Sequence, residues 1–336
     1  MKFCPKFVPA KIVFIAMIFS FGAIDAFVEY NRVLYSSEIA VPGINLGESE
    51  SSIGEIDSNA TSVPGEAIVS VIRDILEDMS HDWLPNDLPV WPTGVLDNPQ
   101  SYQMGQLSAA KQILLIFFQR VSRMNPTDPE NPHLARAVSA IQIDPTSWMM
   151  PAFEDELDHA VRELDVFLGQ IRSGQVKIPD RKDTFAELLK VFGTLLGSSV
   201  GQLGGAPRVG NFTITTMTAG DTHAQGEKVL SRKDMQTPWL QIDNVFYYNQ
   251  GVMFVVKHVL AATLVDFRGL IRAQNSTELG RSIVLIMDPY YYETSPPVVL
   301  NGMPLGLLPN HSIALHAVLL NAWFDITNLS LAVSGR

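Results

Sequence analysis

Two histidines, His311 and His316, stand near the C-terminus, where this side chain could bind a metal ion or transfer a proton. Asn310 is a good helix cap, so we expect a helix to begin at His311. A zinc-binding pair on a helix is spaced four residues apart, whereas these two are five apart and lie about 140° from each other around the axis. The pair therefore does not predict a metal site. We expect His316 to lie in the core, and His311 to be either structural or part of a pocket.

Two other groups of polar residues suggest binding. Asp97 and Asn98 stand between Trp91 and Tyr102 in a Pro-punctuated stretch that we expect to be an ordered loop, and polar groups among aromatic rings suggest a sugar-binding wall. The stretch "LNGMPLGLLPN" places Asn301 in a turn-rich loop that leads to the last helix. A turn at Asp97 remains the structural alternative. The resulting candidate binding site comprises Trp91, Asp97, Asn98, Asn301, Asn310 and His311.

Carboxylates offer a different chemistry, the acid–base hydrolysis of a glycan. The densest acidic cluster begins at Glu154, but it opens a predicted helix, where the helix dipole favours acidic side chains. Asp97 is the other candidate acid. The stretch "GSSVG" fits the G-x-S-x-G pattern at Ser199, but a nucleophile elbow needs a preceding strand, and this stretch continues a helical pattern. The sequence therefore identifies no catalytic residue, and enzymatic activity stays an open alternative.

Composition excludes several other functions. The net charge of −11 disfavours a nucleic-acid partner, because phosphate binding needs clustered Lys and Arg. One cysteine, Cys4, permits neither an internal disulfide nor a cysteine-based zinc site. The P-loop, HExxH and CxxC motifs are absent from the sequence, as is a GxGxxG motif after a strand. We therefore expect no metal site, no cofactor and no nucleic-acid partner.

The N-terminus has the pattern of a membrane-targeting segment. Lys2, Lys6 and Lys11 precede an apolar stretch over residues 12–28, as in a secretory signal or a single membrane span. Because "AIDA" is a poor cleavage site, we favour an uncleaved anchor over residues 1–30 to a cleaved peptide. The lysines would stay in the cytoplasm. This orientation predicts a single-pass protein of the inner membrane with its C-terminal domain in the periplasm.

The remainder of the chain predicts a tether followed by one all-α domain. Residues 31–65, rich in Ser, Glu and Gly, are expected to be a flexible acidic tether. Residues 66–336 are expected to fold as one domain, interrupted at 204–238 by an inserted loop or small hairpin that holds "NFTITTMTAG". Apolar residues at helical spacing predict about seven helices, over 66–80, 106–124, 151–174, 183–203, 244–271, 277–292 and 311–333.

Two of these helices are apolar on nearly all faces, which is typical of helices at the centre of a bundle. The helix over 244–271 carries Lys257 and His258, at least one of which must be buried and paired. The helix over 311–333 could cross a membrane, but Asp325 near its middle favours a buried core helix. We therefore expect both helices to lie inside the domain.

Five segments carry a resemblance to known proteins: "PNDLPVWPTGVLDNPQSYQMGQL", "DPTSWMMPAFEDEL", "IDNVFYYNQGV", "VDFRGLI" and "PPVVLNGMPLGLLPNHSIALHAVLLNAWFDITNL". Together, and in this order, they resemble the DUF2333 family of uncharacterised bacterial proteins. The resemblance extends from about Pro64 to the C-terminus. It implies a single-pass envelope protein of Gram-negative bacteria with an N-terminal membrane segment, and it brings no known catalytic residues.

These observations lead to one preferred function and one alternative. We expect a membrane-anchored, helical periplasmic protein that binds an envelope protein, lipid or glycan, or serves as a scaffold. The alternative is an envelope glycan or lipid hydrolase that uses Asp97 or an acid near Glu154 as its acid or base.

Overall fold

The computed structural model describes residues 39–42, 63–86, 97–122, 129–205, 237, 241–293, 299–301 and 309–334. Most of these residues are helical, and the described part of the chain contains two isolated β-bridges but no strand. The all-α class is therefore confirmed. The helices are α2 (Glu66–His81), α3 (Asp97–Ile116) with a π-helical end η2 (Phe117–Val121), α4 (Pro132–Ile141), α5 (Phe153–Arg172), α6 (Lys182–Gly205), α7 (Ile242–Asp266), α8 (Arg268–Ala273), α9 (Thr277–Glu293) and α10 (His311–Ser334).

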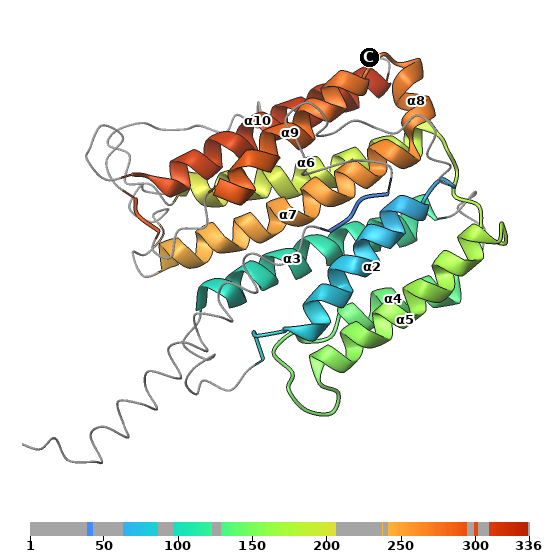
Figure 1. Ribbon diagram of the computed structural model, residues 1–336, viewed down its shortest axis with the longest axis horizontal. Helices are drawn as coiled ribbons and strands as arrows, with labels where there is room; N and C mark the ends of the chain where they lie inside the picture. The colour runs from blue at the N-terminus through green and yellow to red at the C-terminus, as the bar shows by residue number, and fades with distance from the viewer. Residues whose placement is uncertain are drawn as a thin grey trace, which may run out of the picture.

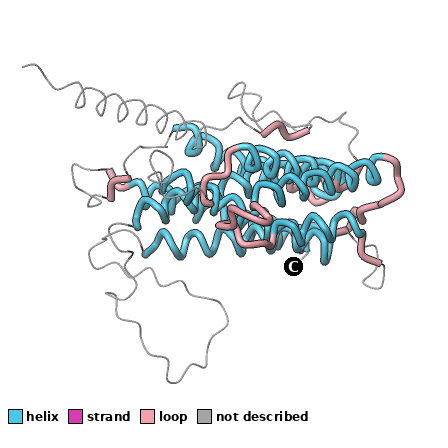
Figure 2. Tube along the Cα trace, turned by 90° about the horizontal axis from the view of Figure 1, so that it is seen from below, coloured by secondary structure: helices cyan, strands magenta, loops and turns pink. Residues whose placement is uncertain are grey.

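The helices form two groups that meet at α7 (Figure 1). On one side α9 and α10 pack together, and α10 also packs along α6. On the other side α5 packs against α2 and α4, and α2 contacts α7. Most of the long helices run along one common axis, as the view from below shows (Figure 2). Because α2, α3, α6 and α9 all contact α7, every side chain of α7 from Asn249 to Asp266 is buried.

Glycine allows α3 and α7 to cross at very short distance. A Cβ atom on Gly105 of α3 would lie 1.9 Å from the carbonyl oxygen of Tyr248, and one on Gly251 of α7 would lie 2.0 Å from that of Tyr102. Both obstacles are backbone atoms, which cannot turn aside as a side chain could. Glycine at both positions is therefore what permits the closest helix pair of the core.

A buried carboxylate joins the end of α7 to the start of α2. Asp266 accepts hydrogen bonds from the backbone N–H groups of Ala67, at 3.2 Å, and Ile68, at 3.0 Å. These are first-turn donors that have no partner within α2 itself. Burial raises the pKa of Asp266 to about 7, although the backbone donors oppose the rise. The start of α2 is thus capped by a residue from a distant part of the chain.

The helix boundaries differ from the sequence prediction in three places. Helix α3 begins at Asp97, inside the stretch that we expected to be a loop. Helix α4 was not predicted, because its prolines indicated a break; Pro132 instead occupies the first turn, and Asn131 caps it by accepting from two backbone N–H groups. The predicted helix over 244–271 is divided at Phe267 into α7 and α8. The described residues thus contain nine α-helices rather than about seven.

The prediction that both apolar helices are buried is correct for α7 and wrong for α10. Helix α10 buries one side, through residues such as Leu315 and Ile326, while Phe324 and Leu331 are 52% and 50% exposed. It lies at the outside of its group, against α6 and α9 (Figure 1). Among the described residues, α10 is also the one helix long and apolar enough to cross a membrane by length and composition.

Several predicted segments lie wholly or largely outside the described residues. The proposed anchor over 1–30 is not among them, and neither is most of the tether over 31–65 or of the inserted segment over 204–238. Within the tether, Ile39 and Val41 are described, and both are buried as members of the core cluster. The anchor, the tether and the inserted loop remain predictions from sequence.

Candidate functional site

Three helices, α3, α7 and α10, begin at the same end of the domain (Figure 1). Asp97, the first residue of α3, interacts with Asp243 and Asn244 in the first turn of α7. One turn further along α7, the ring of Phe246 lies 6.4 Å from the ring of His311, the first residue of α10. The first two turns of α7 therefore lie near the starts of both α3 and α10. We call this the helix-start end.

Asp97 has an unusual electrostatic environment. Burial raises its pKa above the ordinary aspartate value, and the nearby charge of Asp243 adds to the rise. Hydrogen bonds from the backbone of Asp97 and Asn98 and from the side chain of Asn244 act in the opposite direction. Two carboxylates and two amides therefore meet where α3 and α7 begin.

His311 fastens the loop before α10 to the start of that helix. Its Nδ1 accepts a hydrogen bond of 3.0 Å from the Leu300 N–H, and its own N–H donates to the Leu300 carbonyl at 2.9 Å. Asn301 and Asn310 pair in an isolated bridge. Burial lowers the pKa of His311, so the ring is neutral at pH 7. Because Nδ1 is an acceptor, the ring proton lies on Nε2, and Nδ1 has no lone pair left to act as a base.

Asn301 and Asn310, beside His311, both accept hydrogen bonds from the first turn of α10. Asn310 Oδ1 accepts from the Ile313 N–H at 2.9 Å, which confirms the predicted helix cap. Asn301 Oδ1 accepts from the Ser312 N–H at 3.3 Å. Each side chain therefore satisfies a backbone donor that α10 itself leaves without a partner.

Four buried polar atoms at the helix-start end have no hydrogen-bond partner among the residues that the structure describes: Asn98 Oδ1, Asn244 Oδ1, Asn301 Nδ2 and Ser312 Oγ. Buried polar atoms are normally paired, because an unpaired one costs about 1–3 kcal/mol. The set includes two carbonyl acceptors, one amide donor and one hydroxyl. Its members come from the first residues of α3, α7 and α10 and from the loop before α10.

The structure brings five of the six predicted site residues to one end of the domain. Asp97 and Asn98 lie at the first turn of α7. His311 lies near Phe246, one turn further along α7, and Asn301 and Asn310 pair beside it. Trp91 lies outside the described residues. Asp243 and Asn244 belong to the same group but were not among the residues predicted from the sequence. One signal could have identified them, since the dipeptide Asp-Asn opens both α3 and α7.

The other sequence candidates have structural roles. Glu154 accepts a hydrogen bond of 2.6 Å from Asn86 Nδ2 at the start of α5. Ser199 is buried within α6, so the G-x-S-x-G match is not a nucleophile elbow. His316 is buried, as predicted for a core histidine. Within the described residues, no group of three or more His, Cys, Asp or Glu side chains could hold a metal ion.

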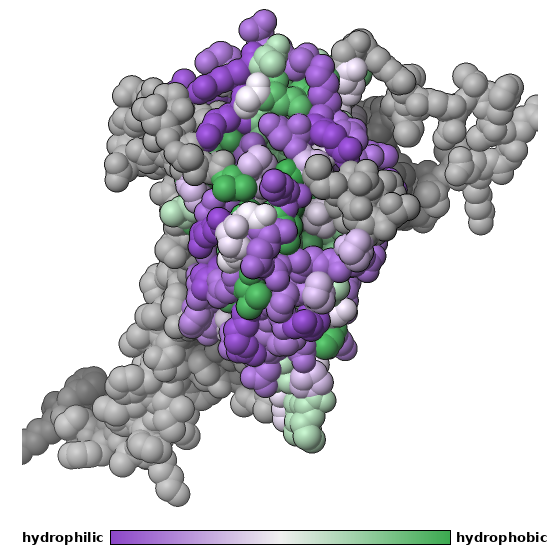
Figure 3. All heavy atoms as spheres, turned by 90° about the vertical axis from the view of Figure 1, so that its right-hand side faces the viewer, coloured by the Kyte–Doolittle hydropathy of each residue, from purple (hydrophilic) through white to green (hydrophobic). Residues whose placement is uncertain are grey.

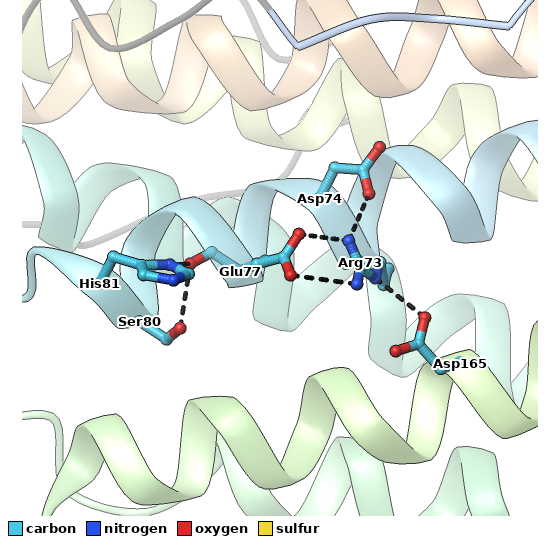
Figure 4. Close-up of polar contacts among 6 residues, drawn as sticks. All are labelled: Arg73, Asp74, Glu77, Ser80, His81 and Asp165. Atoms are coloured by element: carbon cyan, nitrogen blue, oxygen red, sulfur yellow. Dashed lines mark hydrogen bonds and ion pairs between the residues drawn. The ribbon is translucent and has the colours of Figure 1, made fainter.

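A charged cluster between α2 and α5 is likewise structural (Figure 4). Arg73 pairs with Asp165 of α5 at 2.9 Å and with Asp74 at 3.0 Å, and it also bonds to both carboxylate oxygens of Glu77. Its guanidinium group is therefore engaged with three carboxylates. The cluster holds two helices together and presents no free cation to a ligand.

Comparison with known protein families gives a match over most of the chain. The model of the family described as "Uncharacterized protein conserved in bacteria (DUF2333)" matches residues 44–332. No curated protein and no solved structure matches the chain.

Proposed function

The chain belongs to the DUF2333 family of uncharacterised bacterial proteins, and from this premise we propose that it is a binding protein of the cell envelope whose ligand site is the helix-start end. The unpaired atoms of Asn98, Asn244, Asn301 and Ser312 are the observation that carries the proposal. They are contributed by segments distant in sequence. A bound ligand with complementary groups would satisfy them together.

The chemistry of this end favours an envelope glycan as the ligand. A sugar hydroxyl both donates and accepts, so one class of group can serve the two carbonyl oxygens as well as the amide donor. The carboxylates of Asp97 and Asp243 can accept from further hydroxyls. They also disfavour an anionic ligand such as a lipid phosphate, because like charges repel in a partly buried site.

The proposed location rests on the N-terminal sequence. The basic residues before the apolar stretch over 12–28 place the N-terminus in the cytoplasm and the helical domain in the periplasm of a single-pass inner-membrane protein. Protease treatment of spheroplasts tests this orientation. Digestion of the helical domain in intact spheroplasts is expected, while protection until lysis would contradict it.

Glycan binding is tested by titrating the full-length protein with defined envelope fragments, namely a peptidoglycan disaccharide-peptide and an uncharged oligosaccharide of N-acetylglucosamine. The double variant Asn98→Ala and Asn244→Ala should bind the preferred fragment at least about tenfold more weakly, since it loses two acceptors. Asn328→Ala, an exposed asparagine on α10, is the matched control and should bind like the wild type. Equal affinity of all three proteins for every fragment would refute the proposal.

A hydrolase is the second candidate function, and the paired carboxylates favour it. Asp97, with its raised pKa, would serve as the acid, and Asp243 as the second carboxylate. His311 cannot replace them as a base, because its Nδ1 is already occupied. Incubation of wild type and Asp97→Asn with the same fragments separates the two functions. A binding protein leaves the fragments intact, whereas a hydrolase releases product in the wild type and loses this activity in Asp97→Asn.

A further inference from the structure

The loop between α4 and α5 exposes three large apolar side chains in a row. Trp148, Met149 and Met150 are 58%, 56% and 87% exposed. We call them the Trp–Met–Met tip. In Figure 3, pale green spheres project at the lower end of the view, where Figure 1 places the connection between α4 and α5. Consecutive exposed residues of this size are unusual on a protein surface and indicate a binding surface.

The tip is anchored to the core by aromatic residues. The side chain of Trp83 is buried, its indole N–H donates to the Pro145 carbonyl at 2.9 Å, and its ring lies 4.9 Å from that of buried Phe153. Asn86 Nδ2 donates to the Ser147 carbonyl at 3.0 Å. The segment between α2 and α3 therefore holds the base of the loop on both sides.

Hydrogen bonds within the loop close it on itself. The Phe153 N–H donates to the Ser147 carbonyl at 2.9 Å, and Ser147 Oγ donates to the Pro151 carbonyl at 2.7 Å. Trp148 and Ala152 form an isolated antiparallel bridge. The apolar side chains are thus displayed by a backbone that is already fixed, so binding through them loses little conformational entropy.

Met150 has a backbone conformation that a non-glycine residue seldom adopts. Its φ of 49° lies in the left-handed region, which costs an L-residue about 1–2 kcal/mol. Met150 is also the most exposed of the three side chains, so its packing within the domain does not compensate for this cost. Strain of this kind persists where the surroundings impose it, and it often marks functional sites.

Acidic residues surround the tip. Asp144 precedes it and is exposed, while Asp155 and Asp158 are exposed in the first turns of α5, next to half-buried Glu154 and Glu156. Lys111 lies at the base of the loop, where its Nζ donates to the Ile143 carbonyl at 3.3 Å. This charge opposes docking on an anionic membrane surface. It also opposes pairing with a second copy of the chain through this tip, because the acidic residues of the two copies would face and repel each other.

We propose that the Trp–Met–Met tip inserts into an apolar pocket of a second protein, and that Lys and Arg residues rim this pocket. Trp and Met are enriched in the buried core of interfaces, and a few anchors of this type provide most of the binding free energy. Asp144, Asp155 and Asp158 then pair with the basic rim and guide the encounter. This docking site is separate from the helix-start end and does not depend on the function proposed for that end.

Photocrosslinking in the native bacterium tests the proposal with the full-length chain. A photoreactive benzoylphenylalanine replaces Met149, and the crosslinked product is identified by mass spectrometry. The matched control carries the same probe at Val166, which is 46% exposed on α5 outside the tip. The expected result is an adduct with one protein at position 149 and none at 166, attached to a peptide that contains Lys or Arg beside apolar residues.

Two further variants test the chemistry of the interaction. Met150→Ser should reduce the adduct at least fivefold without changing the charge, and the pair Asp155→Lys and Asp158→Lys should reduce it by a similar factor. Thermal unfolding of both variants checks that the helices remain folded. An adduct with lipid, an adduct with a second copy, no adduct above the Val166 control, or a yield that neither variant lowers would each overturn the proposal.

Discussion

Helices α7 and α10 are similar in length and apolar composition, but they occupy very different positions in the domain. Both are apolar on most faces, and both span more than 20 residues. Yet α7 is enclosed by α2, α3, α6 and α9, whereas α10 has neighbours mainly on one side. The difference shows that apolar composition predicts a helix but does not state how many partners will surround it.

Charged residues are expected at the surface and apolar residues in the core, but these two helices show several exceptions. The apolar sequence predicted that at least one of Lys257 and His258 on α7 is buried, and both are fully buried. Burial lowers the pKa of His258 to about 3, and Lys257 adds to the effect, so this ring is neutral at pH 7. On α10, Asn321 and Asn328 are exposed and Asp325 is half-buried, beside exposed Phe324 and Leu331. Position within the bundle, rather than residue type, therefore decides burial.

The largest expected effect is the contribution of buried Asp266 on α7 to the pH dependence of the free energy of unfolding. The pKa of Asp266 on α7 is raised to about 7, so between about pH 4 and pH 7 the folded chain keeps a proton that the unfolded chain has released. The free energy of unfolding should therefore fall as pH rises, by on the order of 4 kcal/mol. Urea unfolding across this range should show a flatter pH dependence in Asp266→Asn than in the wild type. Asn328→Ala on α10 changes no titratable group, so it is the control and should retain the wild-type slope.

A matched pair of phenylalanines tests enclosure directly. Phe254 of α7 is 1% exposed and Phe324 of α10 is 52% exposed. Phe254→Ala should lower the free energy of unfolding by about 4 kcal/mol, because it leaves a cavity. Phe324→Ala should change it by less than about 0.5 kcal/mol. Similar losses in the two variants would show that α10 is covered in solution.

The next largest loss of stability is expected at Gly251, where α3 and α7 cross at short distance. Gly251→Ala places a methyl group against the Tyr102 carbonyl and should cost about 3 kcal/mol, since a backbone atom must move. Gly201→Ala on α6 is the control, because nothing lies within 4 Å of its added Cβ. That variant should gain up to about 1 kcal/mol from helix propensity. Stabilisation of both variants in thermal unfolding would contradict the close approach of α3 and α7.

The smallest effect is expected at the start of α10. His311→Phe keeps a ring near Phe246 but removes the acceptor for the Leu300 N–H, which should cost about 1 kcal/mol. Hydrogen exchange should then accelerate in the first turn of α10 and remain unchanged in α7. Unaltered exchange at Leu300 and in that turn would mean that His311 does not fasten the loop.

The candidate site was only partly predictable. Asp97, Asn98, Asn301, Asn310 and His311 stand out because polar residues occur there beside aromatic or turn-forming residues. Nothing in the sequence shows that the segment at Asp97 and the segment at Asn301, which are far apart along the chain, lie at the same end of the domain. Asp243 and Asn244 were missed for the same reason, since they complete the group only when α3 and α7 run side by side.

The all-α class and most of the helices could be predicted from the amino-acid sequence, because they follow from local periodicity. The five-residue spacing of His311 and His316, which does not suit a shared metal ion, is likewise a local property. Membership of the DUF2333 family is likewise a property of the sequence. The enclosure of α7, the half-exposed position of α10 and the meeting of three helix starts at one end become visible only in the folded domain. Burial and polar contacts depend on neighbours from distant segments, and the periodicity of a single helix carries no information about them.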